Sequence, residues 1–252
     1  MRVFAVSDVH IDYEENYRWL SNLSYADYKD DALILAGDVS GSMRLLEKAF
    51  TDLRQKFKEV AFVPGNHDLW VSHKEGISSF EKFSQIVDVS NSFGIRTEPF
   101  YFGNVTIVPL FGWYDYSFGE PYKEIQDAWA DYFACKWPVD YDDNKITQYF
   151  LGKNNISYTM ENENIISFSH FVPRIDIMPF YIPPSRRKLY PMLGSWKLDS
   201  QIRELGSKIH VYGHSHVNVR TIKDGILYLN NAFGYPYETQ ICAKKLVCVL
   251  EV

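Results

Sequence analysis

The chain contains 252 residues, of which 46% are hydrophobic and 23% are charged, a composition typical of a globular protein and not of a disordered one. Its formal net charge of −6 argues against a protein that coats nucleic acid or an anionic membrane. Its longest charge-free stretch, residues 99–114, is shorter than the roughly 20 residues of a membrane helix. The apolar run at residues 3–6 is too short for a secretory signal, and three cysteines without a C-x-x-C pair suit a reducing compartment, so we expect a cytoplasmic protein.

Short apolar runs alternate with amphipathic stretches along the chain. The runs that predict buried strands are residues 3–6, 32–36, 60–63, 105–110, 165–168 and 209–212. Helical spacing of apolar residues predicts helices over 18–23, 43–57 and 74–93. The strand–helix–strand order indicates an α/β fold. After residue 205 we expect consecutive strands, including a hairpin whose turn is Asp224-Gly225.

Two stretches differ from this pattern. Residues 111–150 hold 13 aromatic side chains and eight acidic residues against three basic ones. Residues 171–191 hold five of the 11 prolines and are expected to form a long stiff loop. We therefore expect a single domain, residues 1–252, with a cap-like insertion at about 112–160.

Polar side chains follow the carboxyl ends of five predicted strands. In chain order these segments are Ser7-Asp8-Val9-His10, Ala36-Gly37-Asp38, Pro64-Gly65-Asn66-His67-Asp68, Ser169-His170 and Gly213-His214-Ser215-His216. Ligands bind at this edge in α/β sheets. Residues i and i+2 of an extended chain point to the same side, so each D-x-H or H-x-H pair is expected to converge on one ion. Imidazole, carboxylate and amide donors suit Mn, Fe, Zn or Ni, with Mg possible, and their number predicts two ions that share a carboxylate.

This order of motifs resembles the calcineurin-like metallophosphoesterase superfamily, and the match runs from Asp8 to His216. The resemblance implies a four-layer αββα sandwich of two mixed β-sheets flanked by helices. It also implies that Asp8, His10 and His216 hold one metal, that Asn66, His170 and His214 hold the other, and that Asp38 bridges both. His67 would then face the phosphate as general acid or charge stabiliser, holding a proton near neutral pH, with Asp68 orienting its ring. A metal-bridging hydroxide would attack phosphorus.

Several other polar residues are expected to be structural. We expect His73 and His210 to be ordinary core or surface residues, Asp12 to cap a helix, the pair Asp142-Asp143 to lie in a solvated turn, and residues 161–163 to form a polar loop. The three cysteines are expected to take no part in the metal site.

Two subclasses of the superfamily fit the motifs poorly. Protein Ser/Thr phosphatases continue G-D with D-R-G and use G-N-H-E, whereas this chain has Val39-Ser40-Gly41 and Asp68. Purple acid phosphatases use D-x-G where this chain has His10.

The sequence indicates the substrate less clearly than it indicates the metal site. Arg174, Arg186, Arg187 and Lys188 could grip a phosphate, although a solvated loop is the simpler interpretation. Trp113, Tyr114, Tyr116 and Phe118 could stack on a base, although aromatic packing is simpler. Together they favour a phosphodiesterase acting on a nucleotide-like or other small phosphoester. A nuclease, a phosphomonoesterase and a non-catalytic metal-binding interaction module are the alternatives, with nucleic acid possible but not favoured. The sequence leaves open the natural substrate, its binding residues, the native metal and the oligomeric state.

Overall fold

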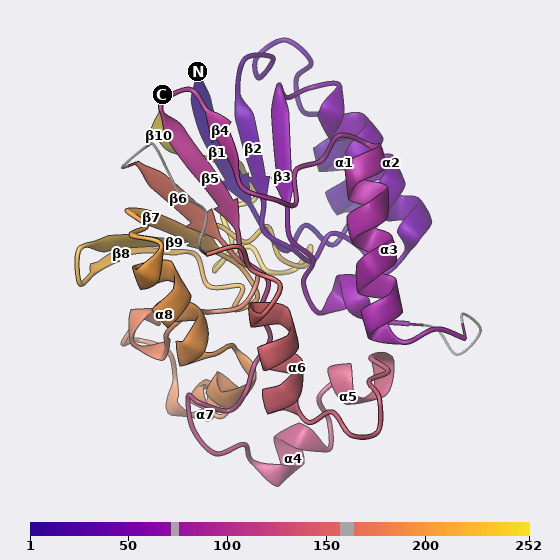
Figure 1. Ribbon diagram of the computed structural model, residues 1–252, viewed down its shortest axis with the longest axis vertical. Helices are drawn as coiled ribbons and strands as arrows, with labels where there is room; N and C mark the ends of the chain where they lie inside the picture. Colours follow the sequence, from indigo (N-terminus) through magenta and orange to yellow (C-terminus); the bar gives the residue numbers. More distant parts are fainter. Residues whose placement is uncertain (72–75, 157–163) are drawn as a thin grey trace.

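Two mixed β-sheets form the centre of the computed structural model, which describes residues 1–71, 76–156 and 164–252 (Figure 1). The four-stranded sheet has the order β10-β1-β2-β3, formed by Val247–Glu251, Arg2–Val6, Ala32–Leu35 and Glu59–Phe62. The six-stranded sheet has the order β4-β5-β6-β7-β9-β8, formed by Phe100–Phe102, Val105–Pro109, Ile165–Phe168, Ile209–Tyr212, Ile226–Asn230 and Val219–Lys223. In both sheets the inner strands are parallel and antiparallel strands occupy edges.

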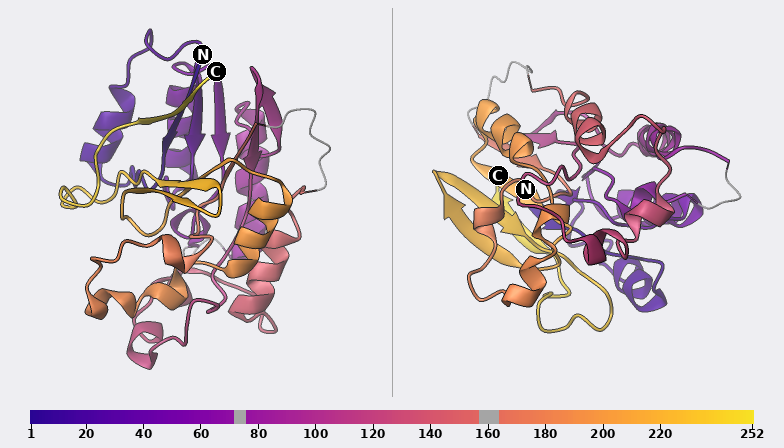
Figure 2. Two further views of the ribbon diagram at one scale, coloured as in Figure 1. Left: turned by 90° about the vertical axis from the view of Figure 1, so that its left-hand side faces the viewer. Right: turned by 90° about the horizontal axis from the view of Figure 1, so that it is seen from below.

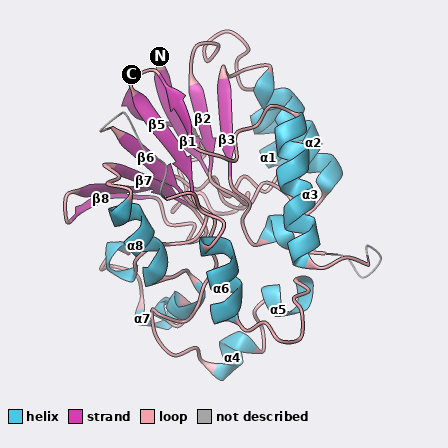
Figure 3. Ribbon diagram, viewed as in Figure 1, coloured by secondary structure: helices cyan, strands magenta, loops and turns pink. Residues whose placement is uncertain are grey.

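Helices cover the outer faces of both sheets (Figures 1 and 3). The helices of the described residues are α1 (Glu14–Ser21), α2 (Met43–Arg54), α3 (Ser79–Ser92), α4 (Lys123–Gln126), α5 (Asp131–Ala134), α6 (Asp143–Leu151), α7 (Pro184–Arg187) and α8 (Trp196–Glu204), with 3-10 turns at His67–Leu69, Ile175–Ile177 and Tyr190–Met192. Helices α1 to α3 lie beside the four-stranded sheet, and α8 lies on the six-stranded sheet (Figure 1).

The six-stranded sheet buries both of its faces. Alternate residues of a strand point to opposite faces. Ile107 and Val211 pack in the interior shared with β1 to β3, while Val108 and Tyr212 pack in a second cluster with Leu198 of α8. This arrangement of helix, sheet, sheet and helix confirms the predicted αββα sandwich.

The predicted elements are largely present, with corrections at helix starts. Helix α3 begins at Ser79, five residues later than predicted, because Ser78 and Glu81 form a capping box. The prediction that Asp12 caps a helix is wrong, since α1 starts at Glu14 and Asp12 accepts a hydrogen bond from the Ser40 hydroxyl at 2.8 Å.

The Asp142-Asp143 pair does not lie in a solvated turn. The Asp142 side chain caps α6 by accepting from the Lys145 N–H at 2.8 Å. Asp143 accepts from the Tyr116 hydroxyl at 2.6 Å. The remaining predictions, for His73 and for residues 161–163, lie outside the described residues.

Two further predictions concern the end of the chain and the membrane. Asp224 and Gly225 both have positive φ, at 50° and 83°, and they join the antiparallel pair β8 and β9, which confirms the hairpin turn. None of the described helices is long and apolar enough to cross a bilayer.

Candidate metal centre

The strand-end motifs meet at one edge of the sandwich, on the side opposite the two chain termini (Figures 1 and 2). Three overlapping groups each place their ligand atoms within 4.8 Å of one another: Asp8 with His10 and His216, Asp38 with His170 and His214, and His10 with Asp38 and His67. Asn66 joins them, since its Oδ1 lies 3.1 Å from Nε2 of His170. The structure therefore brings together all seven predicted metal ligands.

The backbone at these residues is left-handed, not extended as the i, i+2 argument assumed. Asp8, His10, Asp38, His214 and His216 have φ between 44° and 65°, and they are five of the eight non-glycine residues with positive φ in the described part of the chain. Left-handed backbone is costly for residues with a Cβ and clusters at functional sites. The side chains of each motif converge because the chain turns sharply at both positions.

Glycine lets neighbouring backbone approach this crowded centre. A Cβ on Gly37 would lie 2.5 Å from Nδ1 of His170, and one on Gly65 would lie 2.7 Å from carbons of the same ring. Any other residue at these positions would displace His170 from the site.

Asp8, His10 and His216 form the first half of the centre. Nε2 of His216 lies 3.2 Å from Oδ1 of Asp8 and 3.2 Å from Nε2 of His10. Asp8 is fully buried, and its carboxylate accepts hydrogen bonds from the Ser7 hydroxyl at 2.5 Å and the His214 N–H at 3.0 Å. Two nitrogens and one oxygen thus face one point.

Asp38 lies between this half and the second half, formed by Asn66, His170 and His214. Its Oδ1 accepts a hydrogen bond from the His67 N–H at 2.9 Å. Its Oδ2 lies 3.5 Å from Nε2 of His170 and 3.9 Å from Nε2 of His10. One carboxylate oxygen therefore faces both halves, as a bridging ligand must.

The histidine tautomers also suit metal ions. Nδ1 of His170 and Nε2 of His214 each lie 3.0 Å from a backbone carbonyl, of Ala36 and Met192 respectively. A carbonyl only accepts, so those nitrogens carry the protons and the opposite nitrogens are free to ligate. This donor set fits two divalent ions of the first transition row.

Burial shifts the pKa of the imidazoles. It lowers the pKa of His10 to about 3 and those of His170 and His214 to about 4, so these rings are neutral at pH 7, the form that binds metals. His216 is different, since burial opposes its charge but Asp8 and Glu238 raise its pKa to about 10. A divalent ion between the same groups would replace that proton.

His67 faces the open side of the centre. Its ring stacks on Trp70 with centroids 3.7 Å apart, and its Nε2 lies 3.5 Å from the Tyr235 hydroxyl. Burial and then the neighbouring His10 lower the pKa of His67 to about 2. His67 thus lines the pocket beside Asp38 and is placed to contact a substrate there.

Asp68 does not orient the His67 ring as expected. Its buried carboxylate accepts hydrogen bonds of 2.8 to 2.9 Å from four backbone N–H groups, those of Asp38, Val39, Ser40 and Gly65. Asp68 thus fixes the turn that carries Asp38 and ties it to the loop that carries Asn66.

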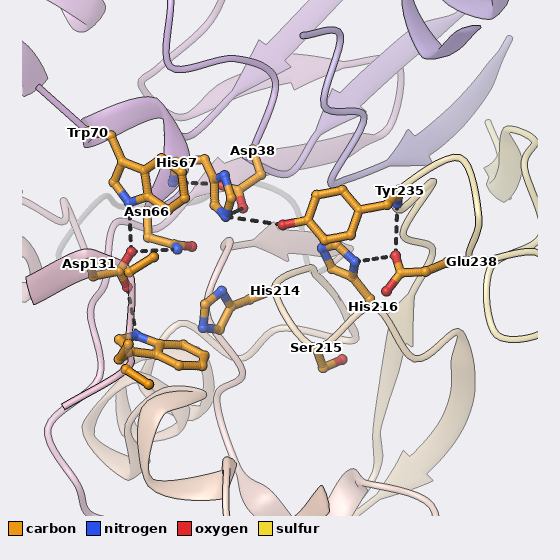
Figure 4. Close-up of a pocket in the computed structure, with 13 residues that line it drawn as sticks. Asp38, Asn66, His67, Trp70, Asp131, His214, Ser215, His216, Tyr235 and Glu238 are labelled. Atoms are coloured by element: carbon orange, nitrogen blue, oxygen red, sulfur yellow. Dashed lines mark hydrogen bonds and ion pairs between the residues drawn. The ribbon is translucent and has the colours of Figure 1, made fainter. Parts of the chain in front are cut away.

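A pocket of about 370 Å³ opens on the centre (Figure 4). Besides predicted ligands, its lining includes residues that the sequence did not indicate, namely Trp70, Ala128, Trp129, Ala130, Asp131, Tyr235 and Glu238. Four of these residues, Ala128 to Asp131, lie in the insertion, and Tyr235 and Glu238 follow the final motif. No motif or residue spacing indicated these residues, although the aromatic content of the insertion did predict a segment distinct from the rest of the fold.

Three basic residues of the loop make contacts within the protein and do not line this pocket. Arg174 is buried and pairs with Asp176 at 2.6 Å and Asp224 at 2.9 Å. Lys188 pairs with Glu124 at 3.0 Å. Arg187 donates to two backbone carbonyls of its own loop.

Two of the four aromatic residues that could stack on a base are buried in the core. Trp113 and Tyr114 are 1% and 0% exposed, so they pack in the core and cannot stack on a substrate. Tyr116 bonds to Asp143, and Phe118 packs on Trp196 with centroids 5.6 Å apart.

His210 and the cysteines are structural, as expected. Both His210 ring nitrogens lie within 3.0 Å of serine hydroxyls, of Ser167 and Ser169. The cysteines are unpaired, and Cys135 and Cys242 are buried. None of them belongs to a candidate metal group among the described residues.

Comparison with known proteins gives a consistent result. Residues 1–218 match the family described as calcineurin-like phosphoesterase. The chain is 27% identical over 260 residues to the [acyl-carrier-protein] phosphodiesterase PptH of Mycobacterium tuberculosis, covering 94% of this chain and 78% of that protein. It is 24% identical over 268 residues to the uncharacterized protein L509 of Acanthamoeba polyphaga mimivirus, covering 94% and 93%. The crystal structure of the phosphopantetheinyl hydrolase PptH from M. tuberculosis has the same fold, with a TM-score of 0.84 at 23% identity over 100% of this chain and 96% of that one.

Proposed function

Because this chain belongs to the calcineurin-like phosphoesterase family, and is therefore a metal-dependent phosphoester hydrolase, we propose that it is a phosphodiesterase that releases the phosphopantetheinyl group from a carrier protein. The observation that carries this proposal is the convergence of seven metal donors on a pocket whose walls include the rings of Trp70, Trp129 and Tyr235. The relative named as an acyl-carrier-protein phosphodiesterase, aligned over 94% of the chain, supports the choice of substrate.

The pocket walls suit a phosphodiester with an uncharged organic arm. Trp129, Ala128 and Ala130 line the pocket, together with Trp70 and Tyr235. Asp131, although acidic, is 2% exposed and its carboxylate is occupied by three side-chain donors. The phosphopantetheinyl arm is amide-rich and uncharged beyond its phosphate, so apolar and aromatic walls can bury it.

We propose that Asp8, His10 and His216 hold one metal ion, that Asn66, His170 and His214 hold the other, and that Asp38 bridges them, with Mn as the metal to test first. Two such ions would lower the pKa of a water and stabilise negative charge on the phosphoryl oxygens.

The protein's own residues position the ester on the pocket side. We assign His67 the role of general acid or charge stabiliser, donating a hydrogen bond to the phosphoryl group or to the oxygen that leaves. Burial, with the nearby carboxylates of Asp38 and Asp8, raises the pKa of Tyr235, so its hydroxyl stays protonated and can donate to the same group. Asp68 acts only indirectly, by fixing the Asp38 turn.

We also propose that the segment at about 112–160 acts as a cap. Its residues Trp129 and Asp131 line the pocket, whereas Trp113 and Tyr114 anchor it in the core.

The direct test is incubation of a phosphopantetheinylated carrier protein with the enzyme and Mn²⁺, followed by mass spectrometry of the carrier. We expect the prosthetic group to be released as its phosphate and the carrier serine to be regenerated. Parallel assays replace the carrier protein with an aryl phosphodiester or an aryl phosphomonoester. Each substrate is also assayed with Ni, Zn or Mg in place of Mn. Hydrolysis of the aryl diester with an intact carrier protein would retain the phosphodiesterase and reject the carrier substrate.

A nucleotide-like phosphodiester is the second candidate, because the indole of Trp129 and the ring of Tyr235 line the pocket and such rings stack on bases. Cyclic and dinucleotide substrates in the same panel distinguish the two. The cytoplasmic location stays a prediction that cell fractionation tests.

A further inference from the structure

Two carboxylates outside the predicted ligand set line the pocket on opposite sides of the metal centre (Figure 4). Asp131 begins α5 in the insertion, and Glu238 lies in the loop after β9. Glu238 is also beyond residue 218, where the family match ends. Each carboxylate contacts one proposed ligand, and they serve opposite halves of the centre (Figure 4).

Asp131 fixes the carboxamide of Asn66. Nδ2 of Asn66 donates to Oδ1 of Asp131 at 2.9 Å, so the amide oxygen must point the other way, toward His170 at 3.1 Å. Asp131 itself is held by the indole N–H groups of Trp70 at 2.7 Å and Trp129 at 2.9 Å. Asp131, held by Trp70 and Trp129, thereby determines which atom of Asn66 faces the proposed metal position.

Glu238 does the same for His216. Its Oε2 lies 2.6 Å from Nδ1 of His216, which leaves Nε2 facing Asp8. The same oxygen accepts from the Tyr235 N–H at 2.8 Å. The turn before it is fixed by Lys244, whose Nζ donates to the carbonyls of three residues, 233 to 235.

We propose that Asp131 and Glu238 are a pair of positioning residues, each of which sets the affinity of one metal position: Asp131 that of the Asn66 side, and Glu238 that of the His216 side. The proposal rests on the ligand assignment given under the proposed function. Partners of this kind orient metal ligands, and their loss typically weakens metal binding by about 10- to 100-fold. The insertion would then complete a metal site as well as wall the pocket.

The test titrates the metal-free protein with Mn²⁺ by calorimetry, with no phosphoester present. We expect the wild type to bind two ions, and both Asp131→Asn and Glu238→Gln to weaken one of them by about 10- to 100-fold while leaving the other within about threefold. Asp199→Asn is the matched control, since Asp199 is also buried and hydrogen-bonded but contacts Tyr228 and Arg203, which belong neither to the ligand set nor to the pocket lining.

Double variants identify which ion each residue serves. In a His216→Ala background, Glu238→Gln should no longer change the affinity of the remaining ion, whereas Asp131→Asn should still weaken it. In an Asn66→Ala background the pattern should reverse. Equal weakening of the remaining ion by both substitutions, or no weakening by either, would overturn the proposal.

A measurement on the wild type covers the case in which Asp131→Asn does not fold. The side-chain amide protons of Asn66, assigned in ¹⁵N NMR spectra by their loss in Asn66→Ser, should exchange slowly and shift when Zn²⁺ is added. Fast exchange with no shift would contradict the role of Asp131. Because these readouts use metal alone, they are independent of the carrier-protein assay, whose failure would change only the substrate.

Discussion

The strand ends and the pocket walls of this protein are built in different ways. The strand ends carry the metal donors on short left-handed turns, each fixed by backbone hydrogen bonds such as those to Asp68. The walls come from the insertion and from the loop after β9, and they contribute rings and the two outer carboxylates. Under the proposed function, the first region performs the hydrolysis and the second selects which phosphoester binds.

This difference predicts that changes at the strand ends affect all substrates alike. For Asp38→Asn we expect a loss of more than about 100-fold in kcat/KM on every phosphoester, since even indirect changes around a metal cost about 10- to 100-fold and this residue lies between both halves of the centre. Bound metal, measured by elemental analysis, should fall in parallel. Retention of two ions and of activity would remove Asp38 from the bridging position.

His67→Ala should reduce kcat by about 10²- to 10⁴-fold, the usual range for a group that assists proton transfer or charge stabilisation. Metal content should stay at the wild-type level, because His67 is assigned to the substrate and not to an ion. A drop in metal content would instead make His67 a ligand, which its 3.9 Å distance to Oδ2 of Asp38 allows geometrically.

Trp129→Ala should separate the two regions most clearly. At saturating Mn²⁺, which compensates for a weaker metal position, we expect KM for the carrier-protein substrate to rise about tenfold, because losing apolar contact in a pocket costs about 1–3 kcal/mol, while kcat/KM for a small aryl phosphodiester changes less than threefold. Trp129→Phe, which keeps the ring and loses the N–H to Asp131, is the control for packing. Equal losses on both substrates would mean that the wall does not select.

The smallest effect concerns the stability of the insertion. Burial raises the pKa of Asp143 to about 6 from its ordinary 3.8, so the folded protein favours the protonated form. This contribution is complete below about pH 4 and is lost as the pH rises through about 6. Asp143→Asn, which is neutral at every pH, should therefore gain a few degrees in Tm relative to wild type between pH 4 and 7.

Asp142→Asn is the matched control for this measurement. Asp142 is exposed, and Asn caps a helix about as well as Asp, so its Tm difference from wild type should not vary with pH in this way. A pH-independent difference for Asp143→Asn as well would refute the role of its buried carboxyl.

The strands and the seven donors could be predicted because each signal is local. A buried parallel strand is a short apolar run, and the motif residues directly follow it. The left-handed turns could not be predicted from the i, i+2 spacing, because extended and left-handed backbone both bring such residues together. The contacts of Asp68 could not be predicted either. The sequence His67-Asp68 is the same whether the carboxylate bonds to the imidazole ring or to the backbone of another loop.

The pocket walls could not be predicted because they depend on contacts between distant segments. Asp131 meets Asn66 across 65 residues, and Tyr235 meets His67 across 168. Arg174 also pairs with a distant segment, since its carboxylate partners include Asp224 in the β8–β9 hairpin.

The five proposed ligand residues with left-handed backbone also affect the stability of the folded protein. A left-handed residue with a Cβ costs roughly 1–2 kcal/mol, so the five together approach the roughly 5–15 kcal/mol of net stability that a typical domain has. Ions that bind only the folded state return stability by mass action. Metal supply would then govern the protein's resistance to proteolysis and its abundance. A shortage of metal would lower the amount of folded enzyme as well as its activity.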